Sequence, residues 1–129
     1  MANWSTLVAY VQSNYKVADQ GPDMIKMIFE TGELRSQVVF LWRQTLTGGE
    51  EWVQIESPFA EVGMVNLQQA LEAIGGMVCG GMAIASGYVT VRHAVPLANL
   101  NINEFERPLL LVTTTADRLE STLIGGDRF

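Results

Sequence analysis

The side chains best suited to covalent chemistry in this chain of 129 residues are its one cysteine, Cys79, and its one histidine, His93. An imidazole that activates a thiol, with an acid to orient it, is the arrangement of a cysteine hydrolase. The spacing of Cys79 and His93 does not require contact between them, and His93 shares a strand face with Val89 and Val91. We therefore expect a buried structural thiol, a partly buried structural histidine and no catalytic residues.

Metal and phosphate chemistry find little support in the sequence. One histidine and one cysteine supply too few soft ligands, and the acids lack the spacing of a calcium loop. The glycine-rich segment 75–81 lacks the Lys-Ser/Thr ending of a P-loop and the strand-glycine-helix order of a dinucleotide site. Asp117 and Arg118 are neighbours on a helix and point in different directions, so we expect a solvated charge pair. We predict no metal, no cofactor and no enzymatic activity.

The charge of the chain argues against two classes of partner. Its formal net charge of −6 at pH 7 repels phosphate backbones and anionic lipids, so we expect neither nucleic acid nor membrane as a partner. Residues 73–91 carry no charge and are long enough to cross a bilayer, but their glycines disfavour a helix and flanking basic residues are missing. A single cysteine and the absence of a secretion signal favour a reducing, cytoplasmic location.

The clearest structural signal begins with residues 88–95, which alternate as a strand with valines on one side. A helix follows, with Asn101 as N-cap and Glu104 placed to close a capping box. We expect Pro108 to kink this helix or to split off its first turn, and glycines 125–126 to end it. One apolar stripe, which needs a sheet to cover, runs along the helix at spacings of three and four: Phe105, Leu109, Val112, Ala116, Leu119 and Leu123.

The remaining periodicities predict one domain over residues 1–129, with an α+β fold in the order α-β-β-β-α-β-β-α and an antiparallel sheet packed by helices. Segments 16–23 and 57–63 have the composition of loops, the second because Pro58 cannot donate to a strand ladder. The expected elements are a helix at 4–15 capped by Ser5, strands at 24–31, 34–46 and 52–56, a helix from Leu67 to about Ile74 capped by Asn66, and strands at 82–85 and 88–95, the last ended by Pro96.

The second strand carries five consecutive apolar residues, 38–42, which place bulk on both faces of the sheet. A sheet covered by helices on one side should alternate here, so the other face is expected to meet a partner, a second copy of the chain or another cover. The run itself does not show which side of the strand faces outward. We assign the partner-binding surface to the even-numbered set, Val38, Phe40 and Trp42, together with Trp52. The methionines 24, 27, 64, 77 and 82 either extend this adaptable surface or fill the core.

Three short segments resemble YbjN-like proteins, relatives of the type III secretion chaperones: 87–92 (Gly-Tyr-Val-Thr-Val-Arg), 95–97 (Val-Pro-Leu) and 116–120 (Ala-Asp-Arg-Leu-Glu). The order of the predicted elements resembles the same fold over nearly the whole chain. The resemblance implies a small, acidic, cytoplasmic protein that is not an enzyme, is commonly dimeric, and holds an extended segment of another polypeptide on exposed apolar surface. The glycine-rich middle departs from the secretion chaperones, and nothing identifies a secretion client.

Three functional hypotheses follow. The first is a non-enzymatic protein-binding module, chaperone-like or a regulatory adaptor, that forms a homodimer and binds a protein partner. The alternative is a regulatory domain that binds an apolar small molecule between sheet and helices, in a cavity lined by Met27, Phe29 and Phe59. A third, hydrolytic, function would require Cys79, His93 and an acid within hydrogen-bond reach.

Overall fold

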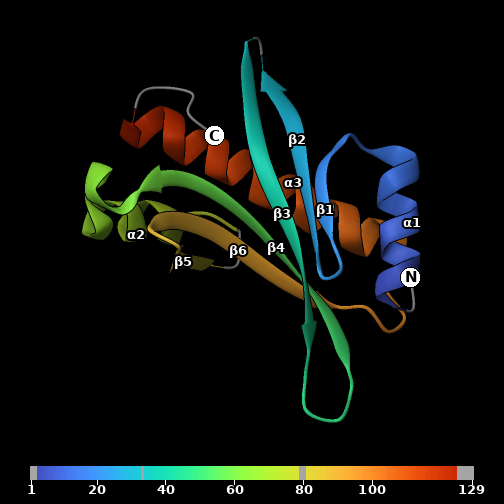
Figure 1. Ribbon diagram of the computed structural model, residues 1–129. Helices are drawn as coiled ribbons and strands as arrows, with labels where there is room; N and C mark the ends of the chain where they lie inside the picture. The colour runs from blue at the N-terminus through green and yellow to red at the C-terminus, as the bar shows by residue number, and fades with distance from the viewer. Residues whose placement is uncertain (1–2, 33, 79–80, 125–129) are drawn as a thin grey trace.

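Six antiparallel strands form one sheet, in the order β1-β2-β3-β4-β6-β5, and the helices cover one of its faces (Figure 1). The computed structural model describes residues 3–32, 34–78 and 81–124. The architecture confirms the expected antiparallel α+β fold. In chain order the elements are α1 (Trp4–Asn14), β1 (Val17–Gly21), β2 (Met24–Gly32), β3 (Arg35–Thr45), β4 (Glu51–Glu61), the short 3₁₀ helix η1 (Val62–Met64), α2 (Leu67–Gly75), β5 (Gly81–Ala85), β6 (Tyr88–Pro96), α3 (Ile102–Leu119) and the π-helical turn η2 (Glu120–Ile124).

The strand β1 is one strand more than the sequence predicted, because segment 16–23 was expected to be a loop. It pairs antiparallel with β2, and its register shifts between Val17 and Asp19. Val17 lies opposite Met27 and packs against the core, whereas the three residues that follow it are exposed. An edge strand of this kind is held mainly by backbone pairing, so its side chains show little of the alternation that marks a strand in sequence.

The strand β4 also differs from the prediction, since it continues to Glu61 and η1 follows, so most of the segment 57–63 that was expected to be a loop is strand. Pro58 lies opposite Thr90 of β6, and the register shifts between Pro58 and Ala60. The bulge at this point lets Phe59 and Ala60 both remain buried. Pro58 is therefore part of the central sheet and not of a connecting loop.

The core lies between the sheet and α3, which runs behind the strands in Figure 1. The apolar stripe of α3 is confirmed, since Phe105, Val112 and Ala116 have no exposed area and Leu109 and Leu119 almost none. The strands contribute the alternate residues of their inner face, and α1 and α2 close the two ends of the core. These further buried side chains are Trp4, Leu7, Val11, Ile25, Met27, Val39, Leu41, Val53, Ile55, Phe59, Ala70, Ile74, Val89 and Val91.

Local capping signals explain where the helices begin. The side chain of Asn101 accepts from the Glu104 amide at 2.8 Å, and Glu104 accepts in return from the Asn101 amide, so the predicted capping box is present. The predicted cap of α2 by Asn66 is also present. The cap of α1 is Asn3 and not Ser5, because the helix begins at Trp4 and Ser5 lies within its first turn.

Several other sequence predictions concern bends and ends. The helix α3 continues through Pro108, so the proline does not split off a short first turn, which was one of the two expectations. Ser86 and Gly87, with φ of 51° and 84°, make the predicted tight turn between β5 and β6. The predicted stop at glycines 125–126 lies outside the described residues. Segment 73–91 is divided among α2, β5 and β6, and in the described part of the chain no helix has the length and apolar character to span a bilayer.

Two tyrosines, one on α1 and one directly after it, contact α3 through one carboxylate. The hydroxyls of Tyr10 and Tyr15 both donate to Oε2 of Glu106, Tyr10 at 2.7 Å. These hydrogen bonds, the one from Tyr15 first, hold the pKa of Glu106 below its usual value. Burial and the bond to Glu106 raise the pKa of Tyr15 well above 10. The ring of Tyr10 also meets that of Phe105 edge-on, with centroids 6.3 Å apart.

The pH dependence of the free energy of unfolding tests the hydrogen bonds from Tyr10 and Tyr15 to Glu106. A carboxylate whose pKa is lowered by folding adds stability above its unfolded pKa of about 4.3, and loses it as the pH falls through the lower folded value. We expect Glu106→Gln to be less stable than the wild type at neutral pH, by a difference that shrinks as the pH falls below about 4, measured by urea unfolding. The exposed Glu30→Gln serves as control. A difference between Glu106→Gln and wild type that does not change with pH would contradict the assignment.

Candidate functional site

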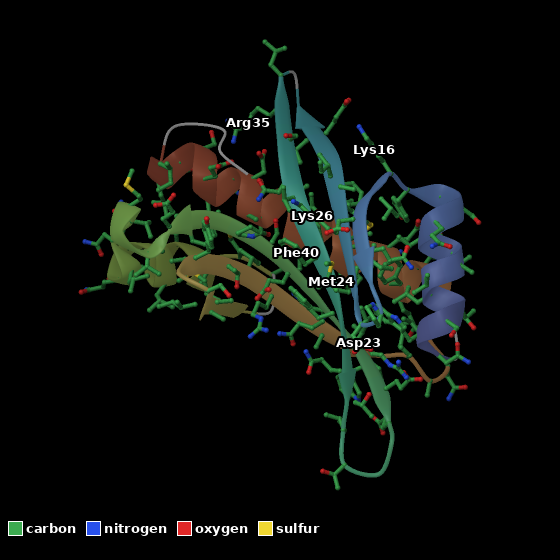
Figure 2. The ribbon with its side chains drawn as sticks, viewed as in Figure 1. Lys16, Asp23, Met24, Lys26, Arg35 and Phe40 are labelled. Atoms are coloured by element: carbon green, nitrogen blue, oxygen red, sulfur yellow. The ribbon has the colours of Figure 1, made fainter. Side chains whose placement is uncertain are left out.

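The face of the sheet opposite the helices carries the residues that the sequence singled out. On β3, Val39 and Leu41 have no exposed area, whereas Val38, Phe40 and Trp42 point the other way and are half-buried. This is the outer face. Figure 2 marks Met24, Lys26 and Phe40 over β2 and β3, with α3 behind the sheet. The even-numbered residues of β3 are therefore the ones that the helices leave uncovered.

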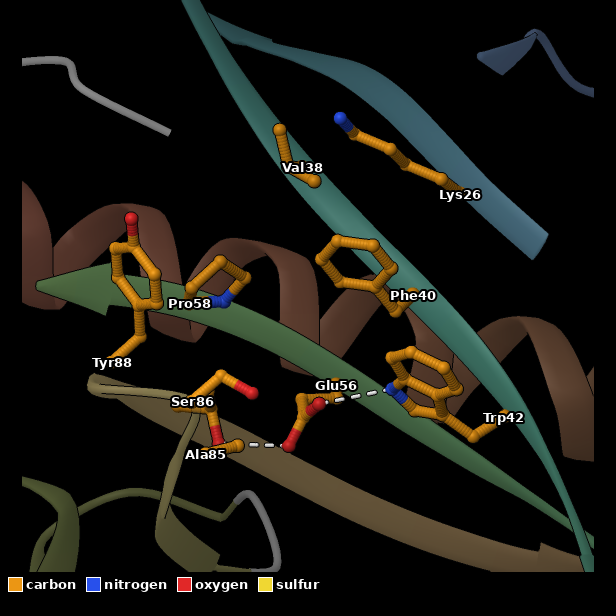
Figure 3. A pocket seen from close by; sticks show the side chains of 10 residues that line it. Lys26, Val38, Phe40, Trp42, Glu56, Pro58, Ala85, Ser86 and Tyr88 are labelled. Atoms are coloured by element: carbon orange, nitrogen blue, oxygen red, sulfur yellow. Dashed lines mark hydrogen bonds between the residues drawn. The ribbon is translucent and has the colours of Figure 1, made fainter. Parts of the chain in front are cut away.

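A hollow of about 420 Å³ lies on the outer face (Figure 3). Its floor is β4, one wall is the row Val38, Phe40 and Trp42 on β3, and the other wall is the hairpin of β5 and β6. We call this space the outer hollow. The residues that line it are Lys26, Val38, Phe40, Trp42, Glu56, Pro58, Ala85, Ser86, Tyr88 and Thr90.

Aromatic rings dominate the β3 wall of the outer hollow. Phe40 and Trp42 stack with centroids 5.4 Å apart and an interplanar angle of 18°. The amine of Lys26, directly opposite Phe40 in the ladder, lies 6.0 Å from the centroid of that ring. Tyr88 stands across the hollow on the opposite wall (Figure 3). The space thus offers flat apolar surfaces with a cation at one rim, which suits apolar side chains better than a reacting group.

The floor of the outer hollow is held by a buried carboxylate, Glu56, which is only 5% exposed. Its Oε1 accepts from the indole nitrogen of Trp42 at 2.9 Å, and its Oε2 accepts from Thr90 at 3.1 Å. Arg92 forms an ion pair with Oε2 at 2.8 Å. A buried charge is tolerated when it is paired and hydrogen-bonded in this way. Glu56 therefore fixes the Trp42 ring and is not left free for acid-base chemistry.

Trp52 lies apart from the other three predicted residues. It is on the same face of the sheet but opposite Gln44, nearer the β3–β4 turn, and its indole donates to Glu50. Together with Gln44, Leu46, Gln54, Arg92 and Ala94 it lines a neighbouring hollow. The structure thus brings Val38, Phe40 and Trp42 together and places Trp52 beside them in a separate depression.

Sequence reasoning missed Lys26, Glu56, Ser86, Tyr88 and Thr90, which also line the outer hollow. Alternation alone assigns Lys26 and Glu56 to the polar side of their strands. Whether that side coincides with the side of Trp42 depends on the register between strands, which the sequence does not give directly. A correct register, with Lys26 opposite Phe40 and Phe40 opposite Glu56, would have found both residues.

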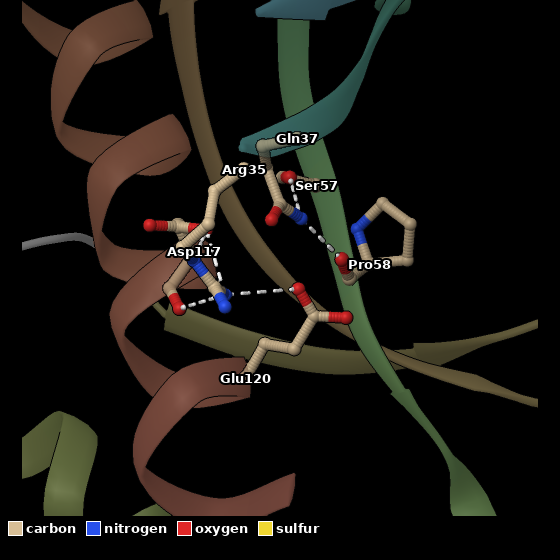
Figure 4. A network of polar contacts seen from close by, with 6 residues as sticks. All are labelled: Arg35, Gln37, Ser57, Pro58, Asp117 and Glu120. Atoms are coloured by element: carbon tan, nitrogen blue, oxygen red, sulfur yellow. Dashed lines mark hydrogen bonds and ion pairs between the residues drawn. The ribbon is translucent and has the colours of Figure 1, made fainter. Parts of the chain in front are cut away.

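Side-chain hydrogen bonds replace the ladder beside Pro58 (Figure 4). The pairing of β3 with β4 ends at Phe40 and Glu56. Beyond it, the amide nitrogen of Gln37 donates to the Pro58 carbonyl at 2.6 Å and to the Ser57 hydroxyl at 2.9 Å, and that hydroxyl donates to the Val38 carbonyl at 2.6 Å. The aromatic wall and the floor of the outer hollow therefore stay joined where proline cannot donate.

Arg35, at the beginning of β3, binds two acids of the last helix (Figure 4). Its Nη2 lies 3.0 Å from Asp117 Oδ1 and 3.5 Å from Oε1 of the fully buried Glu120. The expectation of a solvated pair between Asp117 and Arg118 was wrong, because Asp117 instead reaches across to a strand 82 residues away in sequence. These contacts fasten the beginning of β3 to the last turns of α3 and to the first residue of η2, and they are structural.

The other candidate residues do not form a second site in the described part of the chain. Met27 and Phe59, expected to line a small-molecule cavity between sheet and helices, have no exposed area, and Phe29 packs against the same core. His93 is half-buried and lies opposite Ile55, whereas Cys79 lies outside the described residues. Within residues 3–32, 34–78 and 81–124, no three His, Cys, Asp or Glu are grouped to hold a metal ion.

The methionines divide between core and surface. Met27 is fully buried, and Met77 and Met82 pack against the core. Met64 is 48% exposed, and Met24 lies half-buried opposite Trp42 in the ladder. Of these five, only Met24 adjoins the aromatic wall by register, so the apolar outer face extends from β3 onto β2.

Comparison with known proteins finds no matching family model and no curated protein sequence with significant similarity. The resemblance to YbjN-like proteins therefore depends on the order of elements and on three short segments. Two of these, 87–92 and 95–97, belong to β6 and the residue on each side of it, and the third, 116–120, to the end of α3 and the start of η2.

Unfolding experiments test the role of Glu56. Replacing it by leucine removes the acceptor of two donors and the partner of Arg92, so we expect Glu56→Leu to lose about 1–3 kcal/mol of stability. Thr90→Val removes one donor and leaves the ion pair, so its loss is expected to be smaller. Urea titrations of both variants give the comparison. Wild-type stability in Glu56→Leu would show that the carboxylate does not hold the floor together.

Proposed function

We propose that this protein binds an extended segment of a partner polypeptide on the outer face of its sheet, with Val38, Phe40 and Trp42 as the main contacts and Trp52 beside them. One observation carries the proposal: three large apolar side chains of β3 lie on the face that the helices leave uncovered. Apolar surface gathered in this way on a folded domain is typical of a binding site.

The chemistry of the outer hollow supports a polypeptide as the occupant. Stacked Phe40 and Trp42, with Tyr88 opposite, provide rigid aromatic surfaces of the kind that anchor protein interfaces. Glu56 is already bonded to three side chains, so the hollow offers contact area more than reactivity. A volume of about 420 Å³ suits one or two large side chains of a bound segment.

The wider proposal follows the resemblance found in the sequence. We propose a non-enzymatic, chaperone-like or regulatory adaptor of YbjN-like type, acting as a homodimer in the cytoplasm. The order of elements and the acidic net charge of −6 support this proposal. Relative to the expected order, β1 is an additional strand at the sheet edge.

Replacement of Trp42 by aspartate tests the proposed surface. The new carboxylate would face the hollow beside Glu56. We therefore expect Trp42→Asp to weaken the affinity for the partner, or for a second copy of the chain, by about ten-fold or more. The fold should persist because Trp42 is half-buried on the uncovered face. Light scattering gives the mass, and quantitative capture from native lysate gives the partner yield.

Leu110→Asp is the matched control, because Leu110 is 63% exposed on the helix α3, in the layer opposite the outer face. It removes an exposed apolar side chain and adds the same charge. Circular dichroism confirms that both variants are folded. Equal mass and equal capture for wild type, Trp42→Asp and Leu110→Asp would overturn the proposal.

A further inference from the structure

A half-buried cation stands at the rim of the outer hollow. Lys26 lies on β2 directly opposite Phe40, and its amine is over the ring of that residue. The chain has only one other lysine, Lys16, which is exposed in the turn that follows α1. Figure 2 shows Lys26 in the middle of the outer face and Lys16 away from it. The one lysine on this face therefore stands beside its aromatic wall.

No acid in the described part of the chain forms an ion pair with Lys26. Glu56 is neutralised by Arg92. Asp19, opposite Lys26 on β1, is exposed, and its Oδ1 accepts from the neighbouring amide of Gln20 at 2.8 Å. Lys26 thus provides a positive charge beside an apolar space, with no ion-pair partner among the described residues, on a protein whose net charge is negative.

The sheet sets the distance between this charge and the hollow. The floor is on β4 and Lys26 is on β2, with β3 between them. Two strand spacings amount to about 10 Å, and an extended chain rises about 3.3 Å per residue. A segment that crosses the strands would therefore place an apolar side chain in the hollow and another side chain near Lys26 at a separation of about two to four residues.

We propose that the bound segment carries a carboxylate two to four residues from a large apolar side chain, and that Lys26 pairs with this carboxylate while the apolar side chain fills the outer hollow. The inference rests on the proposed function and specifies the partner. Charge complementarity favours an acidic segment. A basic segment would place a second positive charge next to Lys26 while covering its amine, and the two charges would repel each other. We expect the ion pair with Lys26 to contribute mainly to specificity, by distinguishing acidic from other apolar segments, and less to the affinity itself.

Selection from a random peptide library displayed on phage tests this specificity. The full-length protein is immobilised as wild type, Lys26→Glu, Lys16→Glu and Trp42→Asp, and the enriched sequences are compared. Wild type and Lys16→Glu should enrich Asp or Glu at two to four residues from Phe, Trp, Leu or Met. Lys26→Glu should lose that enrichment and favour Lys or Arg at the same position, with the apolar residue kept.

Affinity measurements on one selected peptide complete the test. Replacement of its acid by the matching amide should weaken binding to wild type by about five-fold and leave binding to Lys26→Gln unchanged. Lys16→Glu gives the same change of net charge as Lys26→Glu and should bind the acidic peptide like wild type, apart from a small effect removed by 0.5 M salt. Lys26→Gln also serves if Lys26→Glu proves unfolded.

The outcomes separate the two proposals. One outcome is that the selected peptides require Trp42 but show no preference for acids, and that wild type and Lys26→Glu select the same sequences. This outcome would overturn the role of Lys26 and leave the proposed function standing. Failure of wild type to select any peptide, or selection that survives Trp42→Asp, would overturn both. Enrichment of acids that reverses in Lys26→Glu and not in Lys16→Glu supports both.

Discussion

The structure depends on the packing of one long helix against one face of a six-stranded sheet. Each fully buried aliphatic or aromatic side chain contributes about 1.5–3 kcal/mol relative to an exposed one. Phe105, Val112 and Ala116 on α3 meet the inward side chains of the central strands, among them Leu41 and Ile55. Because a strand alternates, the inward side of β3 determines which side chains are left to face outward. The aromatic wall is thus a geometric consequence of how the core is filled.

That constraint explains why polar groups on the outer face are arranged around apolar ones. Glu56 sits on the floor of the hollow with Trp42, Thr90 and Arg92 as its partners, so the buried charge is compensated within the sheet. Lys26, two strands away, lies over Phe40 instead. On this face the charge of the floor is neutralised, and the amine of Lys26 adds one positive charge at the rim. The local charge therefore differs from the negative net charge of the whole chain.

Much of the fold was predictable because its signals are local. The capping box at Asn101 and the stripe of α3 follow from residues three or four apart, and the turn at Ser86 follows from its neighbour glycine. The strand β1 was missed because backbone pairing stabilises it more than side-chain pattern. The path of β4 through Pro58 was missed because its compensation comes from Gln37, 21 residues away. Such long-range contacts leave no periodic trace in sequence.

The candidate site was predictable to the same extent. The apolar run 38–42 identified the strand, but a run with bulk on both sides does not give the parity of the outward residues. The even-numbered set was an assumption of the sequence analysis, and these residues lie on the uncovered face. Lys26, Glu56 and Tyr88 come from three other strands, and only the register brings them beside Trp42. A sequence reveals which side chains share a face of one strand far more readily than which strands are neighbours.

The strand β3 is fastened at several points along its length: to α3 through Arg35, to β4 through the side chains of Gln37 and Ser57, and to Glu56 through the indole of Trp42. The aromatic wall is therefore preorganised. Binding to a preformed space costs the protein little conformational entropy. The unfavourable entropy of association therefore comes mainly from the freedom that the ligand itself loses. Encounter then needs no prior opening of the domain, and differences among ligands emerge mainly in how fast they leave.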